Sequence, residues 1–286
     1  MIRGGAENGR AVQRAALVAP LSLLFIVGFV APLGTILRFS LNRFAPLGGM
    51  QVAFSGTQYA EIFTGSYFIT VILRSFEIAL IVVVCDVILA YPLALAIARG
   101  PRHLRMPLVA AVILPLLVSV VVRTFGWEIL LGSTGPIATV LGALLGHPVP
   151  LIFNMTGIVV GLAQVLLPFM TLSLVGSLTR IDPYFEEAAA SLGAGPFRVF
   201  WRVTFPLTIQ GLLTGTMLVF TLALSAFVTP EVLGGGKVGF LTGVIYDQAT
   251  SALNWPLASA LGVILLAITL AILGAYSLVM RYAIGR

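Results

Sequence analysis

Charged residues and cysteines are both scarce in this sequence. Asp, Glu, Lys and Arg make up only 9% of its 286 residues, whereas 59% are hydrophobic and the mean hydropathy is +1.09. One soluble core cannot bury that much apolar surface, which excludes an ordinary water-soluble domain. The single cysteine, Cys85, excludes a disulfide or a cysteine metal cluster within one chain. A lipid bilayer is therefore the expected solvent for most of the chain.

Six apolar runs are long enough to cross a bilayer, since a transmembrane helix needs about 20 mostly apolar residues. Ile137 to Leu145 is too short to span and is expected to form an interfacial or loop helix. The first run is longer than the apolar part of a secretory signal, so it is expected to remain as an anchor. The prediction is an all-α membrane protein with six transmembrane helices, at about 16–38, 67–98, 106–126, 149–178, 205–229 and 253–280.

Basic residues are distributed unevenly over the predicted loops. Cytoplasmic loops carry an excess of Lys and Arg, and with the N-terminus inside, eleven of the sixteen basic residues are on the inner side. Both termini are therefore predicted to be cytoplasmic, with residues 1–15 as an N-terminal segment and 16–286 as the membrane domain. The net charge of +6 reflects this orientation and not nucleic-acid binding. The inner basic residues are Arg3, Arg10, Arg14, Arg99, Arg102, Arg105, Arg180, Arg198, Arg202, Arg281 and Arg286.

The predicted inner loop at about 179–205 has a pattern of a helix followed by a break. Asp182-Pro183 is typical of a helix start, because Asp caps the helix and Pro is tolerated at its first position. Gly193 suits the left-handed residue that ends a helix. The pattern predicts one short helix as far as Leu192 and a second from about Pro196. Taken alone, these local features suit an ordinary cytoplasmic loop equally well.

The order of residues in this loop resembles the cytoplasmic EAA signature of ABC importer permeases. The segment EEAAASLGAGPFRVFWRVTFPL, residues 186–207, contains Glu-Ala-Ala, then Leu-Gly-Ala, then Val-Thr-Phe-Pro before the next span. The resemblance implies that the helix is a coupling helix that fits a groove on an ATP-hydrolysing subunit. Glu186 or Glu187 would pair with basic groups there, and alanines would permit close approach. The residues given this role are Glu186, Glu187, Ala188, Ala189, Leu192, Gly193, Ala194 and Pro206.

Other segments resemble the spermidine/putrescine branch of type I importer permeases, over roughly residues 55–280. They include LPLLVSVVVRTFGWEILLGSTGPI at 114–137 and NWPLASALGVIL at 254–265. This implies a polyamine permease of the B type or a close relative. The branch also contains importers of other small solutes. In addition, Leu116 and Leu117 stand where relatives often carry an aromatic residue, which weakens the expectation of a polyamine.

The resemblance also implies a machine of several chains in the bacterial inner membrane. No Gly-x-x-x-x-Gly-Lys-Ser/Thr loop occurs, so ATP and Mg would bind separate subunits, and no cofactor or metal is expected on this chain. The implied partners are two ATP-binding subunits, a second homologous permease in a heterodimer, a periplasmic substrate-binding protein and membrane lipid. An ion-driven secondary transporter is the alternative. With His103 and His147 in loops on opposite sides, a histidine-based enzyme site is not expected.

A few polar residues lie in or near the predicted spans, where an ionisable side chain in the lipid costs free energy. Asp86 falls in the middle of the second span, and could face a translocation path or meet a polar group on another helix. Arg74 and Glu77 are spaced to pair on one helix face. Carboxylates and aromatic rings suit a polycation, although an interfacial belt would use the same residues. The candidate path residues are Asp86, Arg123, Trp127, Glu128, Glu231, Asp247 and Trp255.

Proline and small residues inside the spans complete the pattern. Pro92, Pro115 and Pro168 each remove a backbone hydrogen bond and are expected to kink their helices. Gly157 and Gly161 form a small-xxx-small pair, which predicts a close packing contact.

Overall fold

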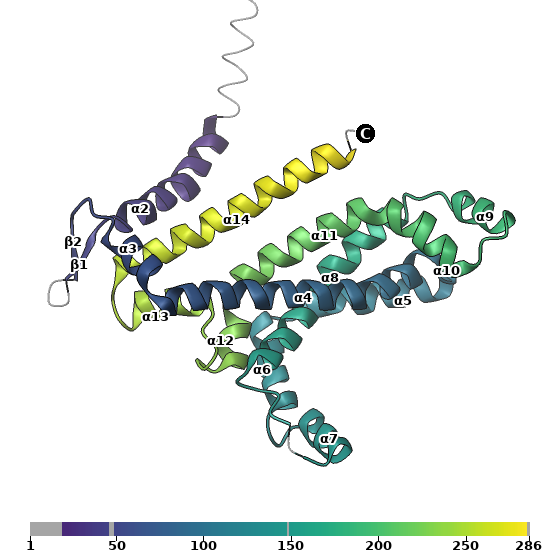
Figure 1. The fold of residues 1–286 in the computed structure, drawn as a ribbon, viewed down its shortest axis with the longest axis horizontal. Helices are drawn as coiled ribbons and strands as arrows, with labels where there is room; N and C mark the ends of the chain where they lie inside the picture. Colours follow the sequence, from purple (N-terminus) through teal and green to yellow (C-terminus); the bar gives the residue numbers. More distant parts are fainter. Residues whose placement is uncertain (1–18, 46–48, 148, 285–286) are drawn as a thin grey trace, which may run out of the picture. The chain divides into compact units, whose positions relative to one another are not determined.

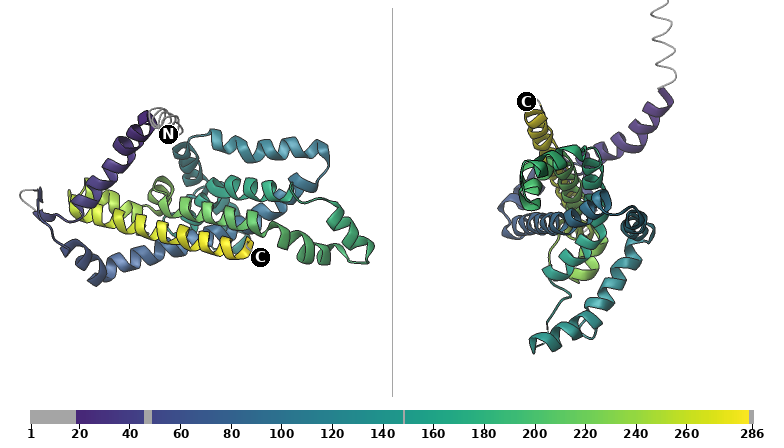
Figure 2. Two further views of the ribbon diagram at one scale, coloured as in Figure 1. Left: turned by 90° about the horizontal axis from the view of Figure 1, so that it is seen from above. Right: turned by 90° about the vertical axis from the view of Figure 1, so that its right-hand side faces the viewer.

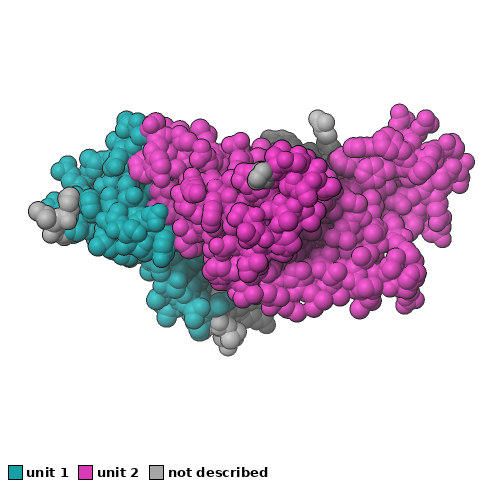
Figure 3. All heavy atoms as spheres, turned by 90° about the horizontal axis from the view of Figure 1, so that it is seen from below, with its two compact units in different colours: residues 1–65, 245–266 teal, residues 66–244, 267–286 magenta. Residues whose placement is uncertain are grey.

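The computed structural model describes residues 19–45, 49–147 and 149–284, and it is mostly helical (Figure 1). The predicted N-terminal segment 1–15, with Arg3, Arg10 and Arg14, lies outside the described residues, as does Arg286. The chain divides into two compact units, coloured separately in Figure 3. Unit 1 comprises the residues up to Gly65 together with Ile245–Leu266, and unit 2 comprises Ser66–Val244 together with the residues from Ala267.

Unit 1 contains a short antiparallel hairpin after its first helical stretch. Phe44 pairs with Met50 in the hairpin. Arg38 fixes the preceding turn, because its guanidinium donates to Asn42 Oδ1 at 2.6 Å and lies 4.3 Å from the ring centre of Phe54. The two strands of the hairpin are too short to show alternating apolar and polar residues, so they were not predicted. The elements up to Gly65 are η1 (Ile26–Val30), α2 (Ala31–Phe39), β1 (Arg43–Ala45), β2 (Gly49–Gln51) and α3 (Thr57–Thr64).

Unit 2 is built on three long helices that contact one another: α4 (Ser66–Arg99), α8 (Met155–Leu178) and α11 (Phe205–Ser225) (Figure 2). Its core is apolar, and Ile78 and Met170 are completely buried in it. The remaining elements are α5 (Arg102–Ile113), η2 (Leu114–Leu117), α6 (Val120–Leu131), α7 (Pro136–Leu145), α9 (Tyr184–Ser191), α10 (Pro196–Val199), η3 (Phe200–Thr204) and α12 (Val228–Gly234); α13 (Leu241–Thr250) and α14 (Trp255–Ile284) each include residues of both units.

Six helical stretches in the described ranges are long and apolar enough to cross a membrane, as predicted. Five of them lie close to the predicted spans. The third differs, as the next paragraph explains. The stretches are Ala19–Phe39, Ser66–Arg99, Val120–Leu145, Met155–Leu178, Pro196–Ser225 and Trp255–Leu278.

The prediction of one continuous third span at 106–126 is wrong. α5 ends at Ile113, a single turn of 3₁₀ helix follows, and the backbone is extended at Val118 before α6 begins. Pro115 has no amide hydrogen to continue the α-helical ladder, and the amide of Val118 bonds to the carbonyl of Pro115 instead. The run Ile137 to Leu145 is helical in α7, but it does not stand alone, since it makes one span-length stretch with α6.

Glycines on α8 and α11 allow close packing in unit 2. A Cβ at Gly161 would lie 2.8 Å from Thr229 Cγ2 on α12, and one at Gly215 would lie 2.7 Å from Met170 Sδ on α8. A Cβ at Gly157 would lie 2.6 Å from the carbonyl of Leu151. The Gly157 and Gly161 pair therefore acts as the predicted packing contact, and side chains there would push neighbouring elements apart.

Candidate functional site

The loop between α8 and α11 folds as the predicted helix and break. Asp182 caps α9, because its Oδ1 accepts from the amide of Tyr184 at 3.0 Å and its carbonyl accepts from the amide of Phe185 at 3.1 Å. At the other end Gly193 adopts φ +83°, and its amide donates to the carbonyl of Ala190 at 2.9 Å. This left-handed conformation favours glycine. The sequence pattern thus predicted both ends of α9 to within about one residue.

One side of α9 presents apolar side chains to the outside of the chain. Tyr184, Phe185, Ala188 and Leu192 lie on this side by their helical spacing, and we call these four residues the α9 apolar surface. Leu192 is 89% exposed and Tyr184 is 73% exposed. Phe197, at the start of α10, is also exposed. An apolar group of this kind, next to charged residues and at the end of a span, is typical of a surface that another protein covers.

The two adjacent acids of α9 have different surroundings. Glu186 forms an ion pair with Arg99 at the end of α4, with 3.3 Å between Arg99 Nη2 and Glu186 Oε1. The same oxygen accepts from Thr204 Oγ1 at 3.0 Å. Glu187 is exposed, and its carboxylate makes no hydrogen bond or ion pair within the part of the chain that the structure describes. Both acids were expected at an interface. In the structure, Glu186 is bonded to other residues of the chain, whereas the carboxylate of Glu187 is accessible.

Aromatic rings join the ends of α4 and α11 beneath this loop. Tyr91 of α4 shares a hydrogen bond of 2.5 Å with Thr208 Oγ1 of α11, and its ring centre lies 5.3 Å from that of Phe200. The ring centres of Trp201 and Phe205 lie 5.0 Å apart, with the ring planes tilted by 50°. These contacts surround η3, the segment of π-helix that connects the loop to α11. Such segments are often found at functional sites.

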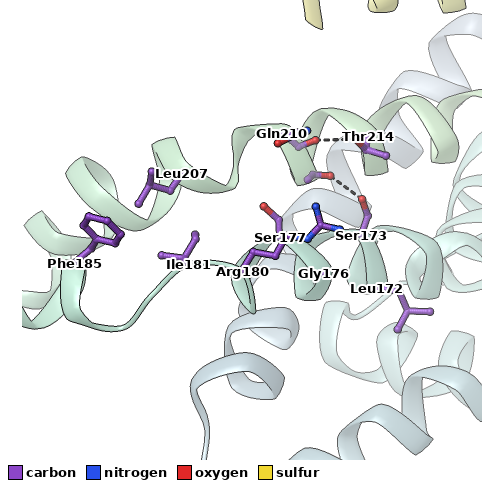
Figure 4. A pocket seen from close by; sticks show the side chains of 11 residues that line it. Leu172, Ser173, Gly176, Ser177, Arg180, Ile181, Phe185, Leu207, Gln210 and Thr214 are labelled. Carbon is purple, nitrogen blue, oxygen red and sulfur yellow. Dashed lines mark hydrogen bonds between the residues drawn. The ribbon is translucent and has the colours of Figure 1, made fainter. Parts of the chain in front are cut away.

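A polar cleft of about 420 Å³ opens beside the loop, between α8 and α11 (Figure 4). Figure 4 shows the side chain of Arg180 turned back toward Ser173 and Ser177. The Ser173 hydroxyl donates to the carbonyl of Gly211 at 2.8 Å. The lining contains one positive charge, that of Arg180, and no carboxylate, so it suits an anion or a neutral acceptor better than a cation. The lining residues are Leu172, Ser173, Gly176, Ser177, Arg180, Ile181, Phe185, Leu207, Gln210, Gly211 and Thr214.

Asp86 lies in the interior of unit 2. It is completely buried in α4, and neither carboxylate oxygen has a hydrogen-bond partner among the described residues. In this structure it is thus closed off from solvent and forms no hydrogen bond to a described residue of another helix. Arg74 and Glu77, expected to pair, are both exposed on α4 and are not joined by an ion pair. A buried carboxyl without a partner is costly, so Asp86 is a point of local instability.

Four of the other candidate path residues lie on two helices that contact each other. α6 carries Arg123, Trp127 and Glu128, and α12 carries Glu231. A hydrogen bond of 3.2 Å between Thr124 and Thr229 joins the two helices.

The three candidate side chains of α6 are all partly buried. Trp127 Nε1 donates to Gln164 Oε1 on α8 at 3.2 Å. Arg123 has two buried nitrogens, Nε and Nη1, without a hydrogen-bond partner in the described part of the chain.

The other two candidate path residues, Asp247 and Trp255, are exposed residues of unit 1.

The side chains that bond the loop to the neighbouring helices were not predicted to belong to the site. Arg99 and Thr204 hold Glu186, and Tyr91 joins α4 to α11. Arg99 was predicted only to be one of the inner basic residues, because its partner Glu186 lies 87 positions further along the chain. No local pattern reports so distant a contact.

Comparison with known proteins supports one family. The family model described as "Binding-protein-dependent transport system inner membrane component" matches residues 129–283. The chain is 31% identical over 218 residues to the spermidine/putrescine permease PotB of Salmonella typhimurium strain LT2, which covers 76% of each chain. It is 32% identical over 170 residues to the molybdenum permease ModB of Mycobacterium bovis, covering 59% of this chain and 63% of ModB.

A solved bacterial ABC transporter that imports alginate has the same fold. Its matching chain superposes with a TM-score of 0.79 at 16% sequence identity, covering 98% of this chain and 99% of that one. At this identity the likeness concerns the fold alone.

Proposed function

Because the chain belongs to the binding-protein-dependent transport system inner membrane components, the permease subunits of ABC importers, we propose that α9 is its coupling helix and that its cargo is a polyamine. The chain is a multi-pass inner-membrane transport subunit and not an ATPase. Family membership implies an ATPase and a periplasmic binding protein as partners. We further propose that two ATPase subunits bind ATP and Mg, and that a second, homologous permease completes the pore.

The observation that carries the coupling role is the α9 apolar surface. Tyr184 and Leu192, at the two ends of the short helix α9, are more than two-thirds exposed, and Asp182 and Gly193 fix the geometry of these ends. Exposed apolar side chains that gather on one side of a helix favour a site where another protein binds. The accessible carboxylate of Glu187 adds a group that pairs with a basic residue of the ATPase.

Polyamine cargo is supported by the PotB relative and by acids on the helices α6 and α12. Glu128 and Glu231 supply negative charge, and Trp127 supplies an aromatic face that favours a cation. We keep Asp86, Arg123, Asp247 and Trp255 as further candidates for the path. Asp86 would have to become accessible in another conformation, because it is buried here.

A second candidate cargo is an anion or a neutral solute rich in acceptors. The polar cleft contains Arg180 and no carboxylate, and Arg123 adds a second positive charge on α6. The ModB relative supports this candidate, as do Leu116 and Leu117 in place of aromatic residues. Either cargo leaves the mechanism of coupling unchanged.

Uptake in proteoliposomes tests the proposed function. The tagged chain is purified with the proteins that bind it in its own membrane, and radiolabelled spermidine, putrescine or molybdate is offered with the binding protein. We expect uptake of a polyamine only when ATP is present on the ATPase side. Uptake of molybdate alone would replace the polyamine proposal with the second candidate. Uptake driven by an ion gradient without ATP would refute the coupling role of α9.

A further inference from the structure

We propose that Arg99, Glu186 and Thr204 form a clamp that makes α9 move as one body with the adjacent ends of α4 and α11. This inference rests on the proposed role of α9 as a coupling helix. The three side chains are positioning residues: they carry a displacement of α9 into the spans and do not themselves bind cargo or ATP. Arg99 lies outside the sequence signature of the loop, and Thr204 lies in its Val-Thr-Phe-Pro part, which gives that side chain no role.

The clamp is centred on one carboxylate oxygen. Glu186 Oε1 is 3.3 Å from Arg99 Nη2 and 3.0 Å from Thr204 Oγ1, so α9 is bonded to α4 and to η3 at the same atom. Arg99 Nη2 also donates to the carbonyl of Ile181 at 3.0 Å, at the beginning of the loop. One side chain of α4 thus holds the loop at two points.

The surroundings of the clamp strengthen these bonds. Thr204 is only 4% exposed, Ile181 is 8% exposed, and the side chains of Arg99 and Glu186 are each 24% exposed. Limited solvent around the pair reduces screening, and hydrogen bonds to charged groups are stronger than those between neutral groups. Arg99 also lies in the last turn of α4, where the helix dipole favours a positive charge.

Among the described residues, no other hydrogen bond or ion pair joins α9 to α4. α9 packs against α10 and η3, and short irregular segments, 179–183 and 192–195, join it to α8 and α10. A pull on the α9 apolar surface would bend these segments before it moved α4. With the ion pair in place, the pull reaches α4 through Arg99 and α11 through Thr204.

This placement also separates the roles of the two acids. Glu187 is exposed and available to an ATPase, whereas an interface that took Glu186 would have to break its bonds to Arg99 and Thr204. Breaking them would leave a partly buried arginine without its partner, which is costly. The geometry therefore assigns docking to one acid and force transmission to its neighbour.

The test uses the complete transporter with its ATPase and measures the solute moved per ATP hydrolysed. Arg99→Gln and Glu186→Gln should still assemble and hydrolyse ATP, but this ratio should fall about five- to tenfold, a usual size for coupling between sites. Thr204→Val should act in the same direction, whereas Thr204→Ser, which keeps the hydroxyl, should behave as wild type. Arg102→Gln and Glu61→Gln, which remove exposed charges, serve as matched controls with an unchanged ratio.

A double-substitution cycle tests whether Arg99 and Glu186 act together. The pair Arg99→Gln with Glu186→Gln should lower the ratio by less than the two single changes combined, because either single change already removes the ion pair. Ratios that stay at the wild-type value, or that fall additively, would overturn the clamp. Loss of ATPase binding in Glu186→Gln would also overturn it, since Glu186 would then be a docking residue. A wild-type chain that moves solute without any ATPase would refute the coupling role itself, which is a separate outcome.

Discussion

At the scale of single residues, neighbours in the sequence have unrelated surroundings. Glu186 and Glu187 are adjacent on α9, yet one is bonded to Arg99 and Thr204 and the other is exposed. The sequence predicted that this pair belonged to a coupling helix, because the EAA pattern is local. It did not predict which acid stays inside, because that depends on α4, whose Arg99 is 87 positions earlier.

Reversal of the accessible charge should uncouple the transporter. We propose that the carboxylate of Glu187 pairs with a basic residue of the ATPase. Glu187→Lys would place two positive charges together there, so ATP-driven uptake should fall at least about tenfold. The chain should still insert, because Glu187 makes no side-chain bond within the described residues. Uptake and ATPase capture are measured together, with Glu61→Lys as the control. Normal uptake by Glu187→Lys would show that this acid does not face the ATPase.

Two substitutions at Gly193 separate backbone strain from steric bulk. Gly193 has φ +83°, and a Cβ there would meet nothing within 4 Å. Gly193→Ala should therefore cost only about 1 kcal/mol of strain and retain most uptake. Gly193→Trp has the same strain but places a large ring beside the α9 apolar surface, so it should abolish ATP-driven uptake. If both variants lose uptake equally, the left-handed turn matters and the open surface does not.

The buried carboxyl of Asp86 gives a stability prediction. Since neither oxygen has a partner, Asp86→Leu should raise the stability of the purified protein by about 1–3 kcal/mol. Asp86→Asn keeps a polar group without obvious partners and should change stability less. Thermal unfolding in detergent measures both. A lower unfolding temperature for Asp86→Leu would mean that the carboxyl finds a partner in the folded protein.

At the scale of elements, length and hydropathy predicted the number of spans but not their continuity. A run of apolar residues looks the same whether its helix is whole or broken, and Pro115 was expected only to kink the third span. In the structure the α-helix ends at Ile113 and Pro115 lies in a turn of 3₁₀ helix. The amide of Val118 bonds to the carbonyl of Pro115, and the chain then extends. The short hairpin was missed because strands of three residues carry no periodic signal.

The contact between α8 and α12 should be sensitive to a single methyl group. Gly161→Ala places a carbon against Thr229 and Leu233, so it should cost about 1–3 kcal/mol by overpacking. Gly176→Ala on the same helix is the matched control, because a Cβ there meets nothing within 4 Å. Thermal unfolding of the two variants compares them. Equal unfolding temperatures would show that α12 moves aside without cost.

At the scale of the whole molecule, the family could be predicted and the cargo could not. The EAA loop and the segments over residues 55–280 are contiguous patterns, so a single sequence contains them. The cargo depends on a binding protein and, in our proposal, on a pore that a second permease completes. The relatives include both a spermidine/putrescine and a molybdenum permease. The polar cleft and the acids on α6 and α12 favour opposite charges.

Because the chain lacks a phosphate-binding loop, transport should depend on a nucleotide site elsewhere in the complex. Removal of Mg²⁺ with a chelator on the ATPase side should abolish uptake even when ATP is present, since phosphoryl transfer needs the metal. The control adds Mg²⁺ back to the same vesicles, which should restore uptake. Uptake that continues in the chelator would point to an ion gradient as the energy source.

The exposed rings of α9 have a consequence for the cell. A copy made in excess of the ATPase would leave the apolar side chains of Tyr184, Phe185 and Leu192 uncovered in the cytosol. Unprotected surfaces of this kind are where aggregation and degradation begin. The supply of ATPase would then determine how many copies of the permease survive, so that an orphaned pore does not accumulate in the membrane.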